Sequence, residues 1–222
     1  MDEPGDLPRI KQFGLQRSGT NVIKWLMERH YFVWIDVNRN GWKHGFVGEA
    51  SQSIDLILIS KNVFAWLDSI FRYSHPVTAA DDPGIFSRFL RSPYIFENAD
   101  APNPVAQWNL MNGHWHSLDL SPRKVVPIRY DDLVYDAEAT CEKLAGKFGI
   151  ERRPVVFKLP AGKMDTGWET TGETDCPMNL EYYRFKEYLK RFSDEDVEWV
   201  SGQVDSQLAM SMGYSECGFA DP

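Results

Sequence analysis

A short polar segment near the start of the chain combines the residue types that bind phosphate groups. It reads Gly14-Leu-Gln-Arg-Ser-Gly19-Thr20-Asn21 and separates a short apolar run from a stretch with helical periodicity. A glycine-containing turn between a strand and a helix aims backbone N–H groups and the helix dipole at an anion. We therefore predict an anion-binding loop here, in competition with an ordinary capped turn. The side chains that could assist belong to Arg17, Ser18, Thr20 and Asn21.

This segment departs from the ATP-binding pattern G-x-x-x-x-G-K-[ST] at the two positions that handle the metal and the terminal phosphate. Thr20 stands where that pattern has lysine, Asn21 stands where it has the metal-binding hydroxyl, and the positive charge has moved to Arg17. The next buried strand carries Asp55 at its start and Lys61 after its end, so no carboxylate is placed to hold Mg²⁺. The sequence predicts an anion site without a metal.

Lys61 is a second candidate because of its place after a strand. The preceding run, Ile54–Ile59, is continuous and branched, as in a parallel strand buried on both faces. Ligands of open α/β sheets lie beyond the carboxyl ends of the strands, so Lys61 could bind a second anion. The alternative is an exposed lysine at a strand end.

Alternating apolar runs and helical patterns would position these residues. The predicted strands cover 10–15, Tyr31–Val37, Ile54–Ile59 and Val125–Tyr130, and the predicted helices cover Thr20–His30, Val63–Tyr73, Gly84–Arg91, Val105–Leu118, Ala137–Phe148 and Leu180–Arg191. Strands that alternate with helices predict an α/β fold in three layers, a mainly parallel sheet flanked by helices. Pro160–Pro177 is expected to be a mobile loop. A further helix should follow Ser193, which forms a capping box with Asp196 and precedes an apolar stripe that continues to Leu208.

Composition limits the class of protein. The chain has 222 residues, is 43% hydrophobic and has a net charge of −8, which fits one domain over 1–222 with a full core. No apolar run approaches the ~18–20 residues of a membrane span, and the acidic start lacks a secretion signal. Three widely spaced cysteines suggest neither a disulfide framework nor a zinc site, so we expect a cytoplasmic protein. The acidic balance argues against nucleic acid as a partner, and any polyanion needs a local basic pocket.

Several segments, in order over about 200 residues, resemble the sulfotransferases that use 3′-phosphoadenosine 5′-phosphosulfate (PAPS). Gln16-Arg17-Ser18-Gly19-Thr20-Asn21 resembles their loop P-[KR]-S-G-T-[TS]. Lys61-Asn62-Val63 with Ser69 resembles R-N-P-x-D-x-x-x-S, with lysine in place of arginine and valine in place of proline. Tyr130-Asp131-Asp132-Leu133 resembles the family's Y-E-D-L/M turn. Lys147-Phe148-Gly149 and Met212-Gly213-Tyr214 resemble two later family segments.

The resemblance implies a P-loop NTPase-like fold and a nucleotide cofactor, PAPS, that donates a sulfuryl group. Arg17 and the amides of residues 17–21 would hold the 5′-phosphosulfate, with Ser18, Gly19, Thr20 and Asn21 as members of that loop. Lys61 and Ser69 would hold the 3′-phosphate, and Tyr130 would contact the nucleoside. Arg17 would also stabilise the charge that develops on the leaving phosphate.

The resemblance also implies a histidine base, and His44 in Trp42-Lys43-His44 is the candidate. An imidazole with a pKa near ~6.5 can accept the proton of a hydroxyl at neutral pH while the oxygen attacks sulfur. A histidine in such a loop is equally often structural, and the pair Asp131-Asp132 is expected to cap a helix rather than catalyse. Two other functions remain: a phosphotransferase that uses ATP and Mg²⁺, and a non-catalytic anion-binding protein of the same fold. The acceptor, whether carbohydrate, lipid, phenol or protein tyrosine, stays open.

Overall fold

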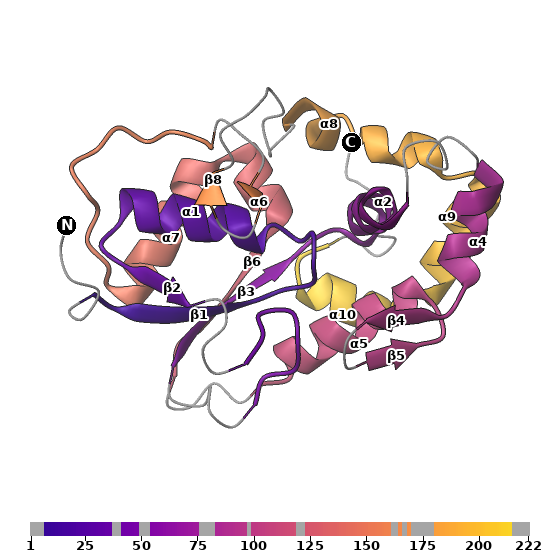
Figure 1. Cartoon of the computed structure of the whole chain (residues 1–222), viewed down its shortest axis with the longest axis horizontal. Helices are drawn as coiled ribbons and strands as arrows, with labels where there is room; N and C mark the ends of the chain where they lie inside the picture. The colour runs from indigo at the N-terminus through magenta and orange to yellow at the C-terminus, as the bar shows by residue number, and fades with distance from the viewer. Residues whose placement is uncertain are drawn as a thin grey trace.

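A four-stranded parallel sheet forms the centre of the fold (Figure 1). The computed structural model describes residues 7–36, 41–48, 54–75, 83–96, 99–118, 123–160, 164–165, 168–169 and 180–214. The strands, in the order of the sheet, are β2 (Trp34–Asp36), β1 (Arg9–Phe13), β3 (Asp55–Ser60) and β6 (Val125–Arg129). All three pairings are parallel, which confirms the predicted parallel α/β sheet.

Helices cover both faces of this sheet, as Figure 1 shows for α1 and α7 on one side and α2 and α5 on the other. The bounds of these helices are α1 Thr20–His30, α2 Val63–Ser74, α5 Pro104–His116 and α7 Ala137–Phe148. Alternate residues of the strands enter two separate cores, so that Ile57 and Ile59 pack with α1 and α7 while Leu56 and Leu58 pack with α2 and α5. A sheet buried on both faces explains why the β3 sequence is a continuous apolar run.

All four predicted strands have somewhat different bounds in the structure. The strand predicted at 10–15 ends at Phe13, and the strand predicted at Ile54–Ile59 is shifted by one residue. The predicted strand Tyr31–Val37 is only β2, because Tyr31 pairs in an isolated bridge with Arg152 and Val37 lies outside the described residues. The predicted strand Val125–Tyr130 ends at Arg129, because Tyr130 begins the short helix α6 (Tyr130–Tyr135).

The last third of the chain differs most from the prediction. One helix was expected over 180–191, but the chain forms α8 (Leu180–Arg184) and a 3₁₀ helix, η2 (Glu187–Arg191), because Lys186 between them has a left-handed φ of 54°. The expected apolar stripe after Ser193 is also divided, because Val204 is extended and a new helix starts after it. These helices are α9 (Asp194–Gln203) and α10 (Ser206–Ser211).

The remaining elements are short. The predicted helix at 84–91 is α4 (Pro83–Arg91), and the hairpin of β4 (Tyr94–Phe96) and β5 (Ala99–Ala101) was not predicted. Most of the loop Pro160–Pro177 lies outside the described residues, and its described parts form the antiparallel pair β7 (Met164–Asp165) and β8 (Trp168–Glu169). None of the described helices is long and apolar enough to cross a membrane.

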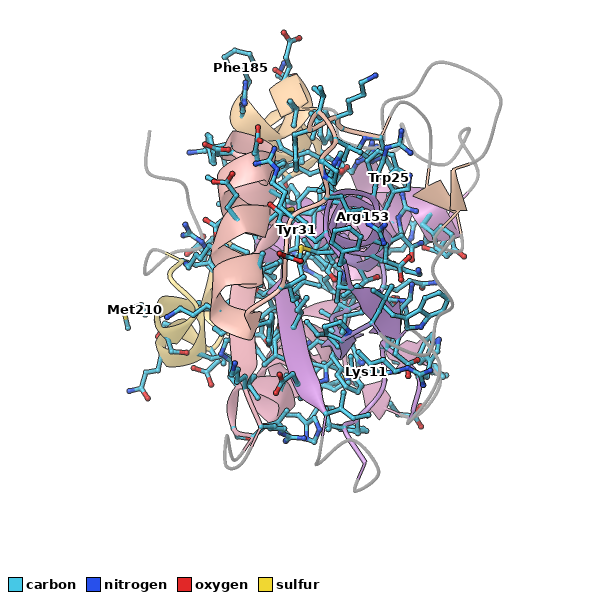
Figure 2. All side chains as sticks on the ribbon, turned by 90° about the vertical axis from the view of Figure 1, so that its left-hand side faces the viewer. Lys11, Trp25, Tyr31, Arg153, Phe185 and Met210 are labelled. Carbon is cyan, nitrogen blue, oxygen red and sulfur yellow. The ribbon has the colours of Figure 1, made fainter. Side chains whose placement is uncertain are left out.

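Side chains fill the space between the layers. Figure 2 shows Tyr31 among packed side chains, whereas Phe185 and Met210 lie at the margins of the molecule. Tyr31 is 1% exposed, and Phe185 is 72% exposed. The predicted capping box of Ser193 and Asp196 is confirmed.

Candidate functional site

The candidate residues gather at the carboxyl edge of the sheet. The loop that begins at Gly14 follows β1, Lys61 follows β3, and Tyr130 follows β6. Because the three strands are parallel neighbours, their carboxyl ends meet at one edge. The sheet therefore brings together residues that lie more than a hundred positions apart in the sequence.

Two positions of the loop have no room for a Cβ atom, and one of them also has a backbone conformation that favours glycine. Gly19 has a φ of 99°, and a Cβ atom there would lie 2.3 Å from Cδ2 of Tyr130. A Cβ atom at Gly14 would lie 2.5 Å from the carbonyl oxygen of Ile59. Tyr130 and the end of β3 therefore pack directly against the backbone of the loop. Gly19 is the N-cap of α1, no side chain caps that end, and the first turn holds no acidic residue, which suits an anion.

Ser18 supplies a polar group inside the loop that has no protein partner. Its side chain is 1% exposed, and its Oγ atom makes no hydrogen bond with any described residue. A buried hydroxyl without a partner costs roughly 1–3 kcal/mol, so such a group beside the uncapped start of α1 fits a ligand site. Thr20, also predicted, is 3% exposed at the start of α1.

Lys61 lies against the loop as a buried cation. Its residue is 3% exposed, and its Nζ atom donates to the hydroxyl of Tyr183 at 2.8 Å and to the carbonyl of Arg17 at 3.4 Å. The ammonium also lies 4.7 Å from the ring centre of Tyr130 and 4.4 Å from that of Tyr183. It forms no ion pair with any carboxylate in the described part of the chain. Burial lowers the pKa of Lys61, and Tyr183 partly offsets that effect.

The guanidinium of Arg17 packs on a neighbouring helix, although its charge is close enough to Lys61 to lower the pKa of that lysine. Arg17 has a left-handed φ of 67°, and its guanidinium lies 5.3 Å from the ring centre of Tyr73 on α2. The side chain is exposed, so it can turn toward the loop without unpacking a core. The predicted contact of Arg17 with an anion requires that rotation.

His44, the candidate base, lies beside the loop. Its Nδ1 atom is 2.6 Å from the carbonyl oxygen of Gly14, while the amide of Gly14 donates to the carbonyl of Lys43. A carbonyl can only accept, so Nδ1 carries the proton and Nε2 is left as the acceptor. Burial lowers the pKa of His44 to about 4, although the bond to Gly14 raises it slightly. The imidazole is therefore neutral at pH 7.

Lys43 is a site residue that the sequence patterns did not indicate. Its Nζ atom donates to Oδ1 of Asn21 in the loop. Burial lowers the pKa of Lys43 to about 8, with further lowering from Lys24 and Lys11. Its adjacency to His44 was the one signal that could have suggested a role. The structure thus adds a cation next to Asn21, where the ATP-binding pattern would place a metal ligand.

The other predicted residues divide into two groups. Tyr130 contacts both Lys61 and the loop, as expected of a residue of the site. Ser69 is 4% exposed on α2, and among the described residues no hydrogen bond links it to Lys61 or the loop. Asp132 is a cap as predicted, since it accepts from the Arg129 amide at 3.2 Å. Asp131 stands in the same first turn, and its Oδ2 atom is buried without a hydrogen-bond partner among the described residues. Burial raises the pKa of Asp131, while its own amide and the Lys61 ammonium oppose that effect.

No group of three or more histidine, cysteine, aspartate or glutamate side chains is arranged to hold a metal ion within the described ranges. A cavity of about 510 Å³ lies between β6, α7 and α10, and its lining includes Arg129, Thr140 and Lys143 rather than the candidate residues. Comparisons with protein-family models, with curated proteins and with solved structures found no match.

Proposed function

We propose that the chain is a sulfotransferase with a P-loop NTPase-like fold that moves a sulfuryl group from PAPS to an acceptor hydroxyl or amine. The observation that carries this proposal is Lys61, a buried cation that forms no ion pair within the described residues, although its charge acts on Asp131, and that lies 3.4 Å from the backbone of the anion-binding loop. A buried ammonium is costly unless an opposite charge compensates it. Two adjacent anion sites fit a donor with separate 5′- and 3′-phosphate groups.

Each part of the site then has a binding role. The loop amides, the Ser18 hydroxyl and the start of α1 hold the 5′-phosphosulfate, and Arg17 turns inward to neutralise it. Lys61 and Ser69 hold the 3′-phosphate, and Tyr130 contacts the nucleoside.

The transfer itself is an in-line displacement at sulfur. The acceptor oxygen forms a bond to sulfur while the bond from sulfur to the 5′-phosphate oxygen breaks, and His44 Nε2 takes the acceptor proton. Lys43 and Arg17 stabilise the negative charge that grows on the leaving phosphate. The tautomer of His44 supports this role, because its bond to Gly14 leaves Nε2 as the acceptor.

The alternative, transfer of phosphate from ATP with Mg²⁺, has less support. Asn21 occupies the position of the metal-binding hydroxyl, and its side-chain oxygen already accepts from Lys43. An ammonium in this position repels a divalent cation and occupies the oxygen that could bind it.

The first test is a thermal shift of the wild type and of Lys61→Met with adenosine 3′,5′-bisphosphate. At ~100-fold above Kd we expect a stabilisation of ~2.7 kcal/mol and a rise in Tm of roughly 5–10 °C for the wild type. Lys61→Met should lose most of this rise, whereas Lys147→Met, at an exposed lysine of α7, should keep it. ATP with Mg²⁺ should have little effect. A shift with ATP and Mg²⁺ alone would instead favour the phosphotransferase. A protein that binds the bisphosphate but sulfates no acceptor from PAPS would be non-catalytic.

A further inference from the structure

A short helix crosses the edge of the sheet where the second anion would bind. We call α8 (Leu180–Arg184) the strap. On one side the hydroxyl of Tyr182 donates to Oδ2 of Asp68 in α2 at 2.7 Å. On the other, Nη2 of Arg184 donates to the carbonyl of Val134 in α6 at 3.2 Å. The strap is thus attached on both sides of Lys61, and Figure 1 shows it above α2 and α6.

Between these two attachments, the hydroxyl of Tyr183 accepts a hydrogen bond from Lys61. The hydroxyl of Tyr183 lies 2.8 Å from Nζ of Lys61, and its ring packs edge-on against Tyr130 at 5.1 Å between centres. The two hydrogen bonds of the Lys61 ammonium therefore go to a phenol and to a backbone carbonyl. Both are formally neutral acceptors around a buried cation, and a phosphate would be a much stronger partner.

We propose that Tyr183 determines specificity by holding Lys61 until the 3′-phosphate of a nucleotide replaces the phenol, which loosens the middle of the strap while Tyr182 and Arg184 keep its two ends attached. This inference rests on the proposed function, since it takes the anion at Lys61 to be a 3′-phosphate. A nucleotide with only a 5′-phosphate binds the loop and leaves the bond between Tyr183 and Lys61 in place. The strap then distinguishes nucleotides by the group at the 3′ position.

The electrostatics of the pair agree with such an exchange. Burial alone would raise the pKa of Tyr183, but the nearby Lys61 ammonium outweighs burial and lowers it. The phenol is therefore a partial counter-charge for Lys61 rather than a simple packing group. A dianionic phosphate is a better counter-charge for Lys61 than a phenol. Replacement of Tyr183 by the phosphate is therefore favourable when a 3′-phosphate is present, and without one Tyr183 stays bound to Lys61.

The test uses Tyr183→Phe, which removes the hydroxyl and keeps the ring. Titration with adenosine 3′,5′-bisphosphate should show binding about tenfold tighter than in the wild type, because no phenol competes for Lys61. Binding of adenosine 5′-monophosphate should not change. Tyr135→Phe, at an exposed tyrosine of α6, is the matched control and should change neither affinity. Unchanged or weaker bisphosphate binding in Tyr183→Phe would overturn the exchange.

Hydrogen exchange of the unmodified protein gives a second measurement. The Phe185 amide donates to the carbonyl of Glu181 in the strap. Its exchange should become faster with the bisphosphate and stay the same with the monophosphate, whereas protection by the bisphosphate would contradict the loosening of the strap. If the wild type does not bind the bisphosphate at all, the proposed function itself fails. If the wild type binds the bisphosphate, but neither the exchange of the Phe185 amide nor the affinity of Tyr183→Phe changes as expected, the proposed replacement of Tyr183 at Lys61 is wrong and the proposed function stands.

Discussion

Burial controls the charge of the side chains that surround the loop. His44 is 6% exposed and Lys61 is 3% exposed, and in each case burial lowers the pKa. For His44 the neutral form is the one that a base needs. For Lys61 the cost of a buried charge is reduced by Tyr183 and would be removed by an anion. Burial thus keeps His44 neutral but also makes it a weaker base, whereas at Lys61 it increases the benefit of binding an anion.

At the residue scale, His44 should make stability depend on pH. Its pKa of about 4 in the folded protein lies below the ~6.5 of an unfolded histidine, so the unfolded state binds more protons between these values. Stability is therefore retained above pH ~6.5 and falls as the pH is lowered toward 4. Between pH 7 and pH 5 this loss is about 2 kcal/mol. Urea unfolding at both pH values should show it in the wild type and not in His44→Gln.

The effect of His44 is the difference between the stability loss of the wild type and that of His44→Gln. His30, His114 and His116 also have lowered pKa values and contribute equally to both losses. Equal losses in wild type and His44→Gln would contradict the buried neutral imidazole. The same variant should keep bisphosphate binding and lose at least ~10²-fold in sulfuryl transfer. Full transfer would exclude His44 as the base.

The sequence predicted some of these residues and not others, for a physical reason. The loop and Lys61 follow apolar runs, which show roughly where strands end, whereas Tyr130 was indicated by the family resemblance and had been placed inside its predicted strand. Lys43 and Tyr183 reach the site from a loop and a distant helix, and their contacts depend on how those segments fold back. Such contacts have no periodicity in the sequence.

At the element scale, predictions were accurate where one signal governs an end. The helix expected at Ala137–Phe148 has those bounds in the structure, because Asp136 caps its first turn and Gly149 ends it in a left-handed conformation. The prediction of one helix at 180–191 was wrong, because Lys186 adopts a positive φ, which cannot be predicted from a lysine in the sequence. Val204 likewise fits an apolar stripe but ends α9.

Two glycines near the end of α7 give a matched pair of substitutions. Gly146→Ala places a methyl group in open space within a helix and should raise the free energy of unfolding by roughly 0.5–1 kcal/mol. Gly149→Ala also enters open space, but its φ of 72° should lower the free energy of unfolding by about 1 kcal/mol. Urea unfolding measures both. Equal effects would show that local packing, rather than backbone conformation, sets the end of α7.

At the scale of the whole molecule, the charge distribution is uneven. The chain has a net charge of −8, yet Lys43 and Lys61 both contact the loop that follows β1, and Lys11 within β1 is close enough to lower the pKa of Lys43. An anionic ligand is therefore attracted by a local field against the overall charge. The later helices support this arrangement, because η2, α9 and α10 pack in the same core as α2 and α5, and Lys61 lies just before α2.

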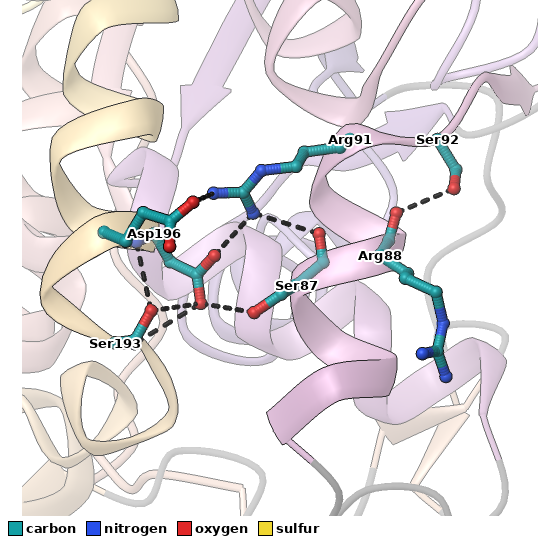
Figure 3. Close-up of polar contacts among 7 residues, drawn as sticks. Ser87, Arg88, Arg91, Ser92, Ser193 and Asp196 are labelled. Atoms are coloured by element: carbon teal, nitrogen blue, oxygen red, sulfur yellow. Dashed lines mark hydrogen bonds and ion pairs between the residues drawn. The ribbon is translucent and has the colours of Figure 1, made fainter.

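A buried polar cluster fixes α9 to α4, and Figure 3 shows its contacts. Asp196 is 2% exposed and accepts from Ser87 at 2.7 Å, from Arg91 at 2.5 Å and from the Ser193 hydroxyl at 2.9 Å. Burial would raise the pKa of Asp196, but these donors outweigh burial and lower it. The carboxylate thus connects two helices that the sequence separates by about a hundred residues.

Asp196→Asn should lower the free energy of unfolding by about 3 kcal/mol at pH 7, since it leaves Arg91 without its buried partner. Asp194→Asn changes an exposed residue in the same first turn of α9 and should cost less than about 1 kcal/mol. Because the pKa of Asp196 is lowered on folding, its contribution is present above the unfolded pKa of ~3.9 and declines as the pH falls further. Urea unfolding at pH 7 and pH 3 should therefore show a large difference between the two variants that narrows in acid. Equal stabilities at pH 7 would mean that apolar packing alone holds α9 against α4, and the cluster would then have no part in supporting the site.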